Sequence, residues 1–320
     1  MAAAMTIQPS SLEDLRKILT DAPSRGAKVG DIDLEALNRV VSHAPEDMTV
    51  TVQAGIRLAR LQAELARRGQ WLPIDPPNPD RRTIGALLAT NASGPRRFGY
   101  GTIRDYLIGI QVALADGRLI RSGGKVVKNV AGYDLAKLFV GSQGTLGVIV
   151  EATFKLRPLP ETEEFVQARR RSLDEAGAVI EAVLESELSP VVLDLHRLPL
   201  GAGSNPDGFV VAAGFAGTRE EVEWELTRAD ELGVSEAATL EYENRFWAES
   251  PSPWRLSVLP SRVVETVRGL GEVPFVARAG NGMIYYRGAA PRANDPGPVG
   301  LMQRLKDEFD PRHIFPEWPL

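Results

Sequence analysis

A chain of 320 residues with 37 basic and 42 acidic side chains carries a formal net charge of -5. It lacks the basic excess on which nucleic-acid binding depends, so we expect no DNA or RNA partner. The sequence contains no cysteine, which excludes disulfides, thiolate nucleophiles and cysteine-held iron–sulfur clusters from this chain. Neither a run of ~18 apolar residues nor a signal-peptide pattern occurs, so we expect no membrane span and a cytoplasmic location.

The first 70 residues predict two short α/β units. Ser10 and Glu13 form the pattern of a capping box that opens a helix over residues 11–20. Residues 49–54 alternate in polarity as a strand does, and residues 58–68 form an amphipathic helix that a glycine closes.

A proline-rich stretch and a helix of small residues follow. Residues 72–82 hold too many prolines for a helix or a central strand, and they predict a rigid extended loop. Residues 83–94 predict a helix that runs into a polar turn. This turn either lines a phosphate group or reflects tight helix packing. An Asp-Gly turn joins 108–115 to 118–121, which predicts a β-hairpin.

The second half of the sequence alternates strands with helices from residue 163 onward. Two of these helices open on capping boxes at Ser172 and Thr218, and a last helix is expected over residues 299–309. Since ~100–200 residues make one domain, the chain is long enough for two. We expect an α+β fold with a first domain over 1–160 and a smaller α+β cap domain over 161–320.

A glycine run marks the end of the first domain. Gly141, Gly144 and Gly147 recur every third residue beside Ser142 and Thr145. This spacing lets backbone N–H groups approach a large polar ligand without Cβ atoms in the way, which favours a cofactor-lining loop. An ordinary glycine-rich strand end is the alternative.

Two strings in this region carry a family resemblance. Residues 128–135 are Lys-Asn-Val-Ala-Gly-Tyr-Asp-Leu, and residues 141–149 are Gly-Ser-Gln-Gly-Thr-Leu-Gly-Val-Ile. Together they resemble the flavin-binding domain of the vanillyl-alcohol-oxidase/PCMH flavoprotein superfamily. The first string most resembles the FAD-binding subunit of glycolate oxidase, the GlcE type. The resemblance is specific from about Thr49 to Arg157 and implies a PCMH-type FAD-binding domain of two α/β subdomains, followed by a smaller α+β cap domain.

The resemblance implies that FAD binds non-covalently, because no histidine occupies the family's early flavin-linking loop. It also implies which residues surround the cofactor: some along the pyrophosphate, some beside the flavin ring and some in the glycine run. These residues are Pro76, Thr83, Ile84, Gly85, Asn91, Ser93, Gly94, Tyr100, Gly101, Arg104, Asp105, Lys128, Asn129, Tyr133, Asp134, Gly141, Gly144, Gly147 and Ile149. From the residues alone, Arg104 and Asp105 would be interpreted as a salt bridge. Four polar side chains among residues 128–134 are unusual for a solvated loop, and a surface turn is the alternative there.

No metal site and no catalytic residue stand out. The three histidines, His43, His196 and His313, lie far apart in sequence and outside any metal-binding pattern, so we expect no metal. No residue is identified as the base of a hydroxy-acid oxidation. Four residues are candidates for anchoring a substrate carboxylate: Arg278, Tyr285, Tyr286 and Arg287. The favoured interpretation of each is that of an ordinary strand residue.

The chain departs from the family pattern at two places. Residues 24–30 replace the family's glycine-triplet phosphate loop with a shorter segment, and residues 315–320 replace the usual C-terminal ending. Both changes imply weaker contacts to FAD.

The function that the resemblance implies is that of the FAD-binding subunit of a glycolate (2-hydroxy-acid) oxidase or dehydrogenase complex. The flavin would accept hydride from the hydroxy acid and pass electrons onward. The implied partners are a catalytic flavoprotein and an iron–sulfur subunit, through which the chain would reach the inner membrane. A non-catalytic scaffold with a degenerate FAD site is the first alternative. A stand-alone oxidase of another alcohol is the second, since a fold does not fix a substrate.

Overall fold

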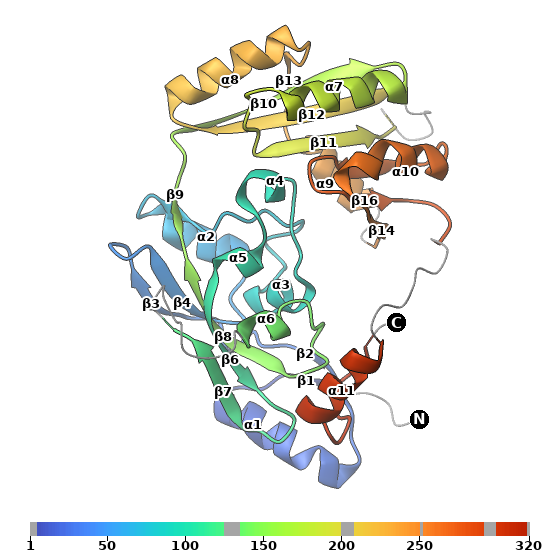
Figure 1. Ribbon diagram of the computed structural model, residues 1–320. Helices are drawn as coiled ribbons and strands as arrows, with labels where there is room; N and C mark the ends of the chain where they lie inside the picture. The colour runs from blue at the N-terminus through green and yellow to red at the C-terminus, as the bar shows by residue number, and fades with distance from the viewer. Residues whose placement is uncertain (1–4, 125–134, 200–207, 250–251, 291–298, 319–320) are drawn as a thin grey trace.

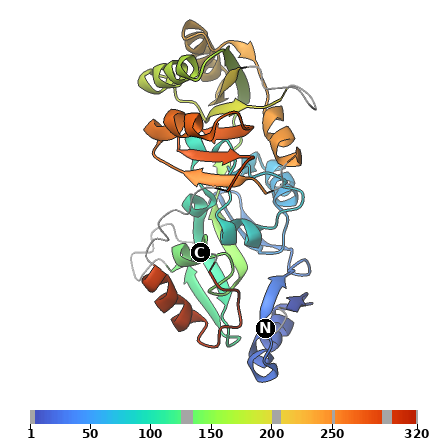
Figure 2. The ribbon, with the colours of Figure 1, turned by 90° about the vertical axis from the view of Figure 1, so that its right-hand side faces the viewer.

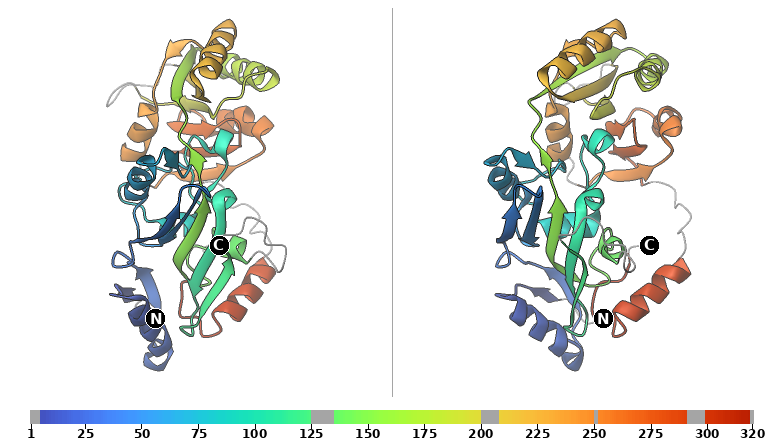
Figure 3. Two further views of the ribbon diagram at one scale, coloured as in Figure 1. Left: turned by 90° about the vertical axis from the view of Figure 1, so that its left-hand side faces the viewer. Right: turned by 60° about the vertical axis from the view of Figure 1, so that its left-hand side comes forward.

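The computed structural model describes residues 5–124, 135–199, 208–249, 252–290 and 299–318. Helices and strands alternate along the chain, and the described strands form two larger sheets that lie one above the other (Figure 1). β8 (Val148–Lys155) belongs to the first sheet and leads through β9 (Arg157–Pro158) into β10 (Thr162–Arg170) of the second (Figure 3).

The first sheet has five strands and is antiparallel throughout. Its strands, in spatial order, are β3 (Val40–Ala44), β4 (Thr49–Gln53), β8, β6 (Leu107–Ala113) and β7 (Leu119–Gly123). The predicted hairpin is confirmed, because β6 and β7 pair from Gly109–Gly123 to Ala113–Leu119.

Short helices cover this sheet, and their apolar residues share one core with it. These helices are α1 (Leu12–Asp21), α2 (Leu58–Ala66), α3 (Ile84–Thr90), α4 (Arg97–Tyr100), α5 (Ile103–Tyr106) and α6 (Ala136–Phe139). Leu15, Leu61 and Leu87 are fully buried in that core. β1 (Met5–Ile7) pairs in parallel with β2 (Val29–Ile32), and β5 (Gln70–Trp71) pairs with β9.

The capping box expected at Ser10 and Glu13 lies one residue further along the chain. The Oγ of Ser11 accepts a hydrogen bond from the backbone N–H of Asp14 at 3.1 Å, and the Asp14 carboxylate accepts one from the N–H of Ser10 at 2.8 Å. The helix therefore begins at Leu12, because an aspartate at the third helical position serves the reciprocal bond as well as a glutamate does.

The second sheet has seven strands, of which neighbouring ones are antiparallel. In spatial order they are β13 (Glu236–Ala237), β10, β12 (Phe209–Gly217), β11 (Val192–Arg197), β15 (Phe275–Arg278), β16 (Met283–Tyr286) and β14 (Trp254–Ser257). α7 (Leu173–Glu185), α8 (Arg219–Glu231) and α10 (Val263–Leu270) share the core on one face. α9 (Glu241–Glu249) packs on the other face, against Ala212 and Val276. The expected caps at Ser172 and Thr218 are confirmed.

The C-terminal segment returns to the first sheet. α11 (Val299–Phe309) lies beside it at the base of the molecule (Figure 2). Ile314 and Phe315 then enter the core that the first sheet shares with its helices. In the part of the chain that is described, no helix is long and apolar enough to cross a membrane, and no three acidic or histidine side chains are grouped to hold a metal.

Candidate functional site

A pocket of about 500 Å³ lies between the two sheets. The first half of the chain lines it with residues from the end of α3 and from the turn at 141–143, and the second half with residues from α9, β14 and β16. Of the expected FAD-contacting residues, three line this pocket: Asn91, Ser93 and Gly141.

The wall on the first-sheet side depends on how α3 begins and ends. The Thr83 hydroxyl caps its first turn by accepting from the N–H of Ala86 at 3.3 Å. The helix stops at Asn91, whose left-handed backbone (φ 47°) turns the chain toward the pocket. An asparagine adopts this conformation more readily than most residues, so the sequence sets where the helix stops.

The glycine run joins this wall although it lies 50 residues further along the chain. The N–H of Gly141 donates to the carbonyl of Leu88 at 2.9 Å, and the N–H of Gln143 donates to the carbonyl of Ala89 at 2.8 Å. The C-terminal turn of α3 and the 141–143 turn therefore form one continuous surface.

Two buried polar atoms in this surface lack a hydrogen-bond partner among the described residues. They are the Oδ1 of Asn91 and the Oγ of Ser142. Leaving such an atom unpaired costs about 1–3 kcal/mol, and native structures rarely tolerate it without a function. Asn91 lines the pocket, so a ligand with a hydrogen-bond donor would satisfy its Oδ1, whereas Ser142 is not a lining residue. The Asn91 side of this surface therefore fits a polar cofactor.

The pocket is also strongly cationic. Arg82, Arg97 and Arg255 line it, and none of its described lining residues is acidic. Arg97 makes a long contact of 3.4 Å to the Ser93 hydroxyl. The guanidinium groups of Arg82 and Arg255 make no hydrogen bond or ion pair with any other described residue. Such a site favours phosphate and carboxylate groups.

A larger hollow of about 770 Å³ surrounds the connection from β9 to β10, but its chemistry is different. Its lining includes the carboxylates of Glu161 and Glu221 and only one expected FAD residue, Tyr100. Arg157 also lines this hollow, but its two carboxylates make it less favourable to a diphosphate or a carboxylate than a pocket lined by three arginines. The smaller cationic pocket is therefore the candidate site.

The expected glycines fall into two groups. A Cβ built on Gly94 would lie 1.9 Å from the backbone oxygen of Asp75, and one built on Gly147 would lie 2.7 Å from Cγ1 of Val112. These two glycines make room for the chain itself. Gly85 and Gly101 do the same more loosely, against Ala54 and Asp105.

Gly141 and Gly144 differ from those four. They have positive φ, 84° and 75°, as Gly101 does, which disfavours any residue with a Cβ, but the space around them is open. A Cβ on Gly141 would meet only Asn91 at an ordinary 3.7 Å, and one on Gly144 would meet nothing within 4 Å. These are the two positions of the glycine run that leave space for a ligand.

Other expected residues support the pocket without lining it. Ile84 and Ile149 lie in the core. Asp105 caps α5: the N–H of Thr102 donates to its carboxylate at 2.8 Å. Partial burial acts to raise the pKa of Asp105, but the hydrogen bonds from Thr102 hold it below its ordinary value. An ion pair between Arg104 and Asp105 is not found among the described residues. Pro76 is buried in the loop before α3.

Four expected contacts, Lys128, Asn129, Tyr133 and Asp134, lie outside the described residues. The shorter segment at 24–30 forms a single 3-10 turn at Pro23–Arg25 that leads almost directly into β2.

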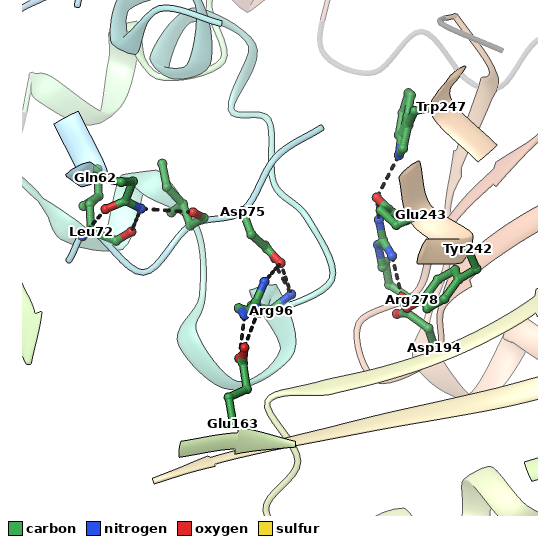
Figure 4. A network of polar contacts seen from close by, with 11 residues as sticks. Gln62, Leu72, Asp75, Arg96, Glu163, Asp194, Tyr242, Glu243, Trp247 and Arg278 are labelled. Carbon is green, nitrogen blue, oxygen red and sulfur yellow. Dashed lines mark hydrogen bonds and ion pairs between the residues drawn. The ribbon is translucent and has the colours of Figure 1, made fainter. Parts of the chain in front are cut away.

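Of the four candidates for a carboxylate anchor, Tyr285 alone lines the pocket. Arg278 is 2% exposed and pairs with Asp194 and Glu243, so it cannot also hold a substrate (Figure 4). The Tyr286 hydroxyl donates to the carbonyl of Ala289, and Arg287 pairs with Glu249.

An ion-paired arginine joins the two sides of the pocket. Arg96 contacts Asp75 in the proline-rich loop at 3.0 Å and Glu163 on β10 (Figure 4). Burial raises the pKa of Asp75 to about 7, although the charge of Arg96 opposes this. Arg96 thus ties the loop before α3 to the second sheet.

Comparisons with known proteins agree with this geometry. Residues 31–123 match a family model described as an FAD binding domain. The chain is 39% identical over 163 residues to the Bacillus subtilis protein named glycolate oxidase subunit GlcD, which covers 51% of this chain and 35% of the relative. It is 36% identical over 161 residues to Escherichia coli glycolate oxidase subunit GlcE, a match that covers 50% of this chain and 45% of the relative. It is 40% identical over 131 residues to a D-lactate dehydrogenase of Archaeoglobus fulgidus, a match that covers 41% of this chain and 27% of the relative. The matched part spans less than half of each relative.

The fold is similar to that of a solved alkyldihydroxyacetonephosphate synthase. The TM-score is 0.74 at 16% identity, over 97% of this chain and 75% of that one. The expected α+β fold of the PCMH type is confirmed. Residues 31–123 match an FAD binding domain, in agreement with the sequence resemblance, and FAD is the cofactor of that domain.

Proposed function

We propose that this chain is the FAD-binding subunit of a glycolate-type 2-hydroxy-acid oxidase or dehydrogenase. The observation that carries the proposal is the pocket between the sheets, whose described lining includes three arginines and no carboxylate. A diphosphate and a hydroxy acid are both anions, so one cationic pocket suits both. The similarity to glycolate oxidase subunits and to D-lactate dehydrogenases gives the substrate class.

The roles of the lining residues follow from their chemistry. We assign Asn91, Ser93 and the backbone of Gly141 to the cofactor, and Arg82 and Arg97 to its phosphates. FAD supplies the hydride acceptor when bound. No histidine lines the pocket among the described residues, which supports non-covalent binding.

Arg255 and Tyr285 come from the second sheet. They face the pocket from neighbouring strands, where they pair directly with each other in register. We assign both to the substrate side of the pocket.

We place the domain boundary near residue 160. Residues 1–160 would form the FAD-binding domain and residues 161–320 the cap domain, whose C-terminal part returns to the first. The separate cores of the two sheets support this division, and the burial of Ile314 and Phe315 in the first core supports the return.

We further propose that the partners of this chain are a catalytic flavoprotein and an iron–sulfur subunit. The chain itself would lie in the cytoplasm and reach the inner membrane through those partners. Two relatives are named as subunits of glycolate oxidase. The chain has no cysteine of its own, so iron–sulfur clusters held by cysteine would belong to another subunit.

Flavin retention tests the cofactor assignment. Gly141→Val is expected to lower the flavin content of the purified protein about tenfold or more, which corresponds to ~1.4 kcal/mol of lost binding energy. The branched side chain would occupy space at the pocket wall. Flavin is measured by visible absorbance, before and after denaturation releases it.

Gly271→Val is the matched control. Gly271 resembles Gly141 in its positive φ, 73°, and in the open space around it. It lies at the end of α10 and does not line the pocket. Both variants place a branched side chain on a residue of positive φ, so equal flavin loss in the two would count against the assignment. Gly147→Val cannot serve this purpose, because its side chain would collide with Val112.

Turnover should depend on partner subunits. No described residue lining the pocket is aspartate, glutamate or histidine, so an evident general base is missing there. Such a base contributes ~10²–10⁴-fold to a rate. The isolated chain with added FAD is expected to oxidise glycolate little or not at all with an artificial dye acceptor, and to gain activity with its partners. Robust turnover by the chain alone would refute this expectation.

A further inference from the structure

A second pocket, of about 380 Å³, lies on the second sheet and shares no lining residue with the candidate FAD site. Strands β10, β11 and β12 form its floor, and the start of α9 forms one side. Its volume is near the lower end of the ~300–1,000 Å³ that small-molecule sites occupy. Its polar side chains include His196, Arg169 and Arg245.

His196 is a buried imidazole without a hydrogen bond. The residue is 6% exposed, and neither ring nitrogen has a partner among the described residues. Its ring stacks on Tyr242, with the centroids 4.3 Å apart and the planes 12° from parallel. Tyr242 is itself fixed, because its hydroxyl donates to Asp194 at 2.6 Å (Figure 4). The stack packs the imidazole against Tyr242, and no described residue satisfies its N–H, which proteins rarely tolerate without a function.

The charges around His196 keep it neutral. Burial is the largest cause that lowers its pKa, to about 3, and the positive charges of Arg245, Arg169 and Arg278 lower it further. A neutral imidazole has one N–H donor and one acceptor nitrogen. The same positive charges that oppose its protonation favour a negative ligand beside it.

Arg245 supplies a cation that no described acidic residue pairs with. Its guanidinium makes no hydrogen bond or ion pair with another described residue. Arg169 differs, because it pairs with Glu236 at 3.2 Å. Glu241 also lines the pocket, beside Arg245 on α9. Arg245 is therefore the charge that a ligand would meet unpaired.

We propose that this second pocket binds a small anion that carries a carboxylate or a phosphate group. Arg245 is its charge partner, and the N–H of His196 donates a hydrogen bond to it. Both ring nitrogens are shielded from solvent, so binding requires the imidazole to turn toward the pocket, and the unmade hydrogen bond favours that turn. The site is separate from the candidate FAD pocket and does not depend on the function proposed for it.

Nuclear magnetic resonance of the histidine rings tests this proposal in the full chain. The sequence has only three histidines, so the His196 signal is assigned by its loss in His196→Phe. Sodium D-lactate and inorganic phosphate are titrated separately at constant ionic strength. We expect a saturable shift of the His196 signal with one or both probes. Saturation with lactate identifies a carboxylate ligand, and saturation with phosphate identifies a phosphate ligand.

Two arginine variants give the matched comparison. Arg245→Met is expected to weaken binding about tenfold or more, as the loss of a charge-assisted hydrogen bond does. Arg255→Met removes a cation from the other pocket and should leave the His196 titration unchanged. Arg245→Lys, which keeps the charge, should retain most of the binding and guards against a folding defect in Arg245→Met.

Either of two results would overturn the proposal. The first is no saturable His196 shift up to about 50 mM of either probe, a concentration that detects even millimolar affinity. An internal water would then be the partner of the imidazole. The second is full affinity in Arg245→Met, which would separate the shift from the charge that defines the site.

Discussion

Replacing Arg278 with methionine is expected to lower the free energy of unfolding by about 3–5 kcal/mol. Arg278 is 2% exposed and lies between the carboxylates of Asp194 and Glu243, which are buried as well (Figure 4). Without the guanidinium, two carboxylates remain in the core with no cation beside them. Urea unfolding with an unchanged m-value would measure the loss as one of stability.

The loss should also grow with pH. Burial raises the pKa of Asp194 to about 6 even with Arg278 present, and removing Arg278 raises it further. A carboxylate whose folded pKa exceeds its unfolded value favours the folded state at low pH, and this stabilisation is lost as the pH rises through the folded pKa. Arg278→Met should therefore be more destabilising at pH 8 than at pH 5.

An exposed ion pair is the control for this experiment. Arg268 pairs with Asp174 on the surface, where the side chains are 57% and 83% exposed. Arg268→Met should change stability by no more than about 1 kcal/mol. Adding Asp194→Asn and Glu243→Gln to Arg278→Met should recover part of its loss, because the unpaired charges disappear. An Arg278→Met variant as stable as Arg268→Met would contradict the account of the buried cluster.

Local signals in the sequence predicted the fold well. The hydroxyls of Ser172 and Thr218 each accept a hydrogen bond from the backbone N–H three residues further along, so the sequence pattern alone was enough to predict these caps. The β6–β7 hairpin was predicted for the same reason, from an Asp-Gly turn of two residues. The one shift, from Ser10 to Ser11, arose because two serines and two acidic residues stand side by side.

The buried charge cluster could not be predicted, because its members are distant in sequence. Asp194 and Arg278 are 84 positions apart and meet only because β11 pairs with β15. In the sequence Arg278 was a candidate for anchoring a substrate carboxylate, with an ordinary strand residue as the favoured interpretation. Burial and pairing rule out that role, and neither can be inferred from the residues around it.

Glycines in the first half show a similar limit. Gly94 and Gly147 fit a ligand-lining pattern, yet they make room for Asp75 and Val112, which are distant in sequence. A glycine indicates that something approaches closely, but not what approaches. Family resemblance placed both Asn91 and Gly141 near FAD, but neither it nor any periodicity indicated that the two lie side by side.

The lining arginines gave no signal that sequence alone could resolve. Arg82 and Arg97 each end an Arg-Arg pair, and on a surface both would be ordinary. Arg255 lies on an edge strand of the second sheet and enters the pocket only through the packing of the two sheets.

The C-terminal ending offers the second large effect. Lys306 of α11 is 3% exposed, and its ammonium pairs with Asp310 at 2.7 Å. It also donates to the carbonyl of Thr145 in the glycine run at 2.9 Å and to the carbonyl of Pro316 at 3.0 Å. One buried cation therefore ties the unusual C-terminal ending to the loop proposed to hold FAD.

Lys306→Met is expected to lower the free energy of unfolding by about 3–5 kcal/mol, because it leaves the Asp310 carboxylate buried without its cation. Flavin content should fall as well, since the loop at 141–147 loses the contact that fixes Thr145. Urea unfolding measures the first effect, and visible absorbance of the purified protein measures the second.

Arg304→Met provides the comparison, because Arg304 is exposed on the same helix and its replacement leaves the buried contacts intact. It should keep both stability and flavin. Lys306→Met with Asp310→Asn separates the two effects: neutralising the carboxylate should restore part of the stability, whereas the contact to Thr145 stays lost and flavin content stays low. If flavin retention returned together with stability in that double variant, Lys306 would act on the cofactor only through the general stability of the fold.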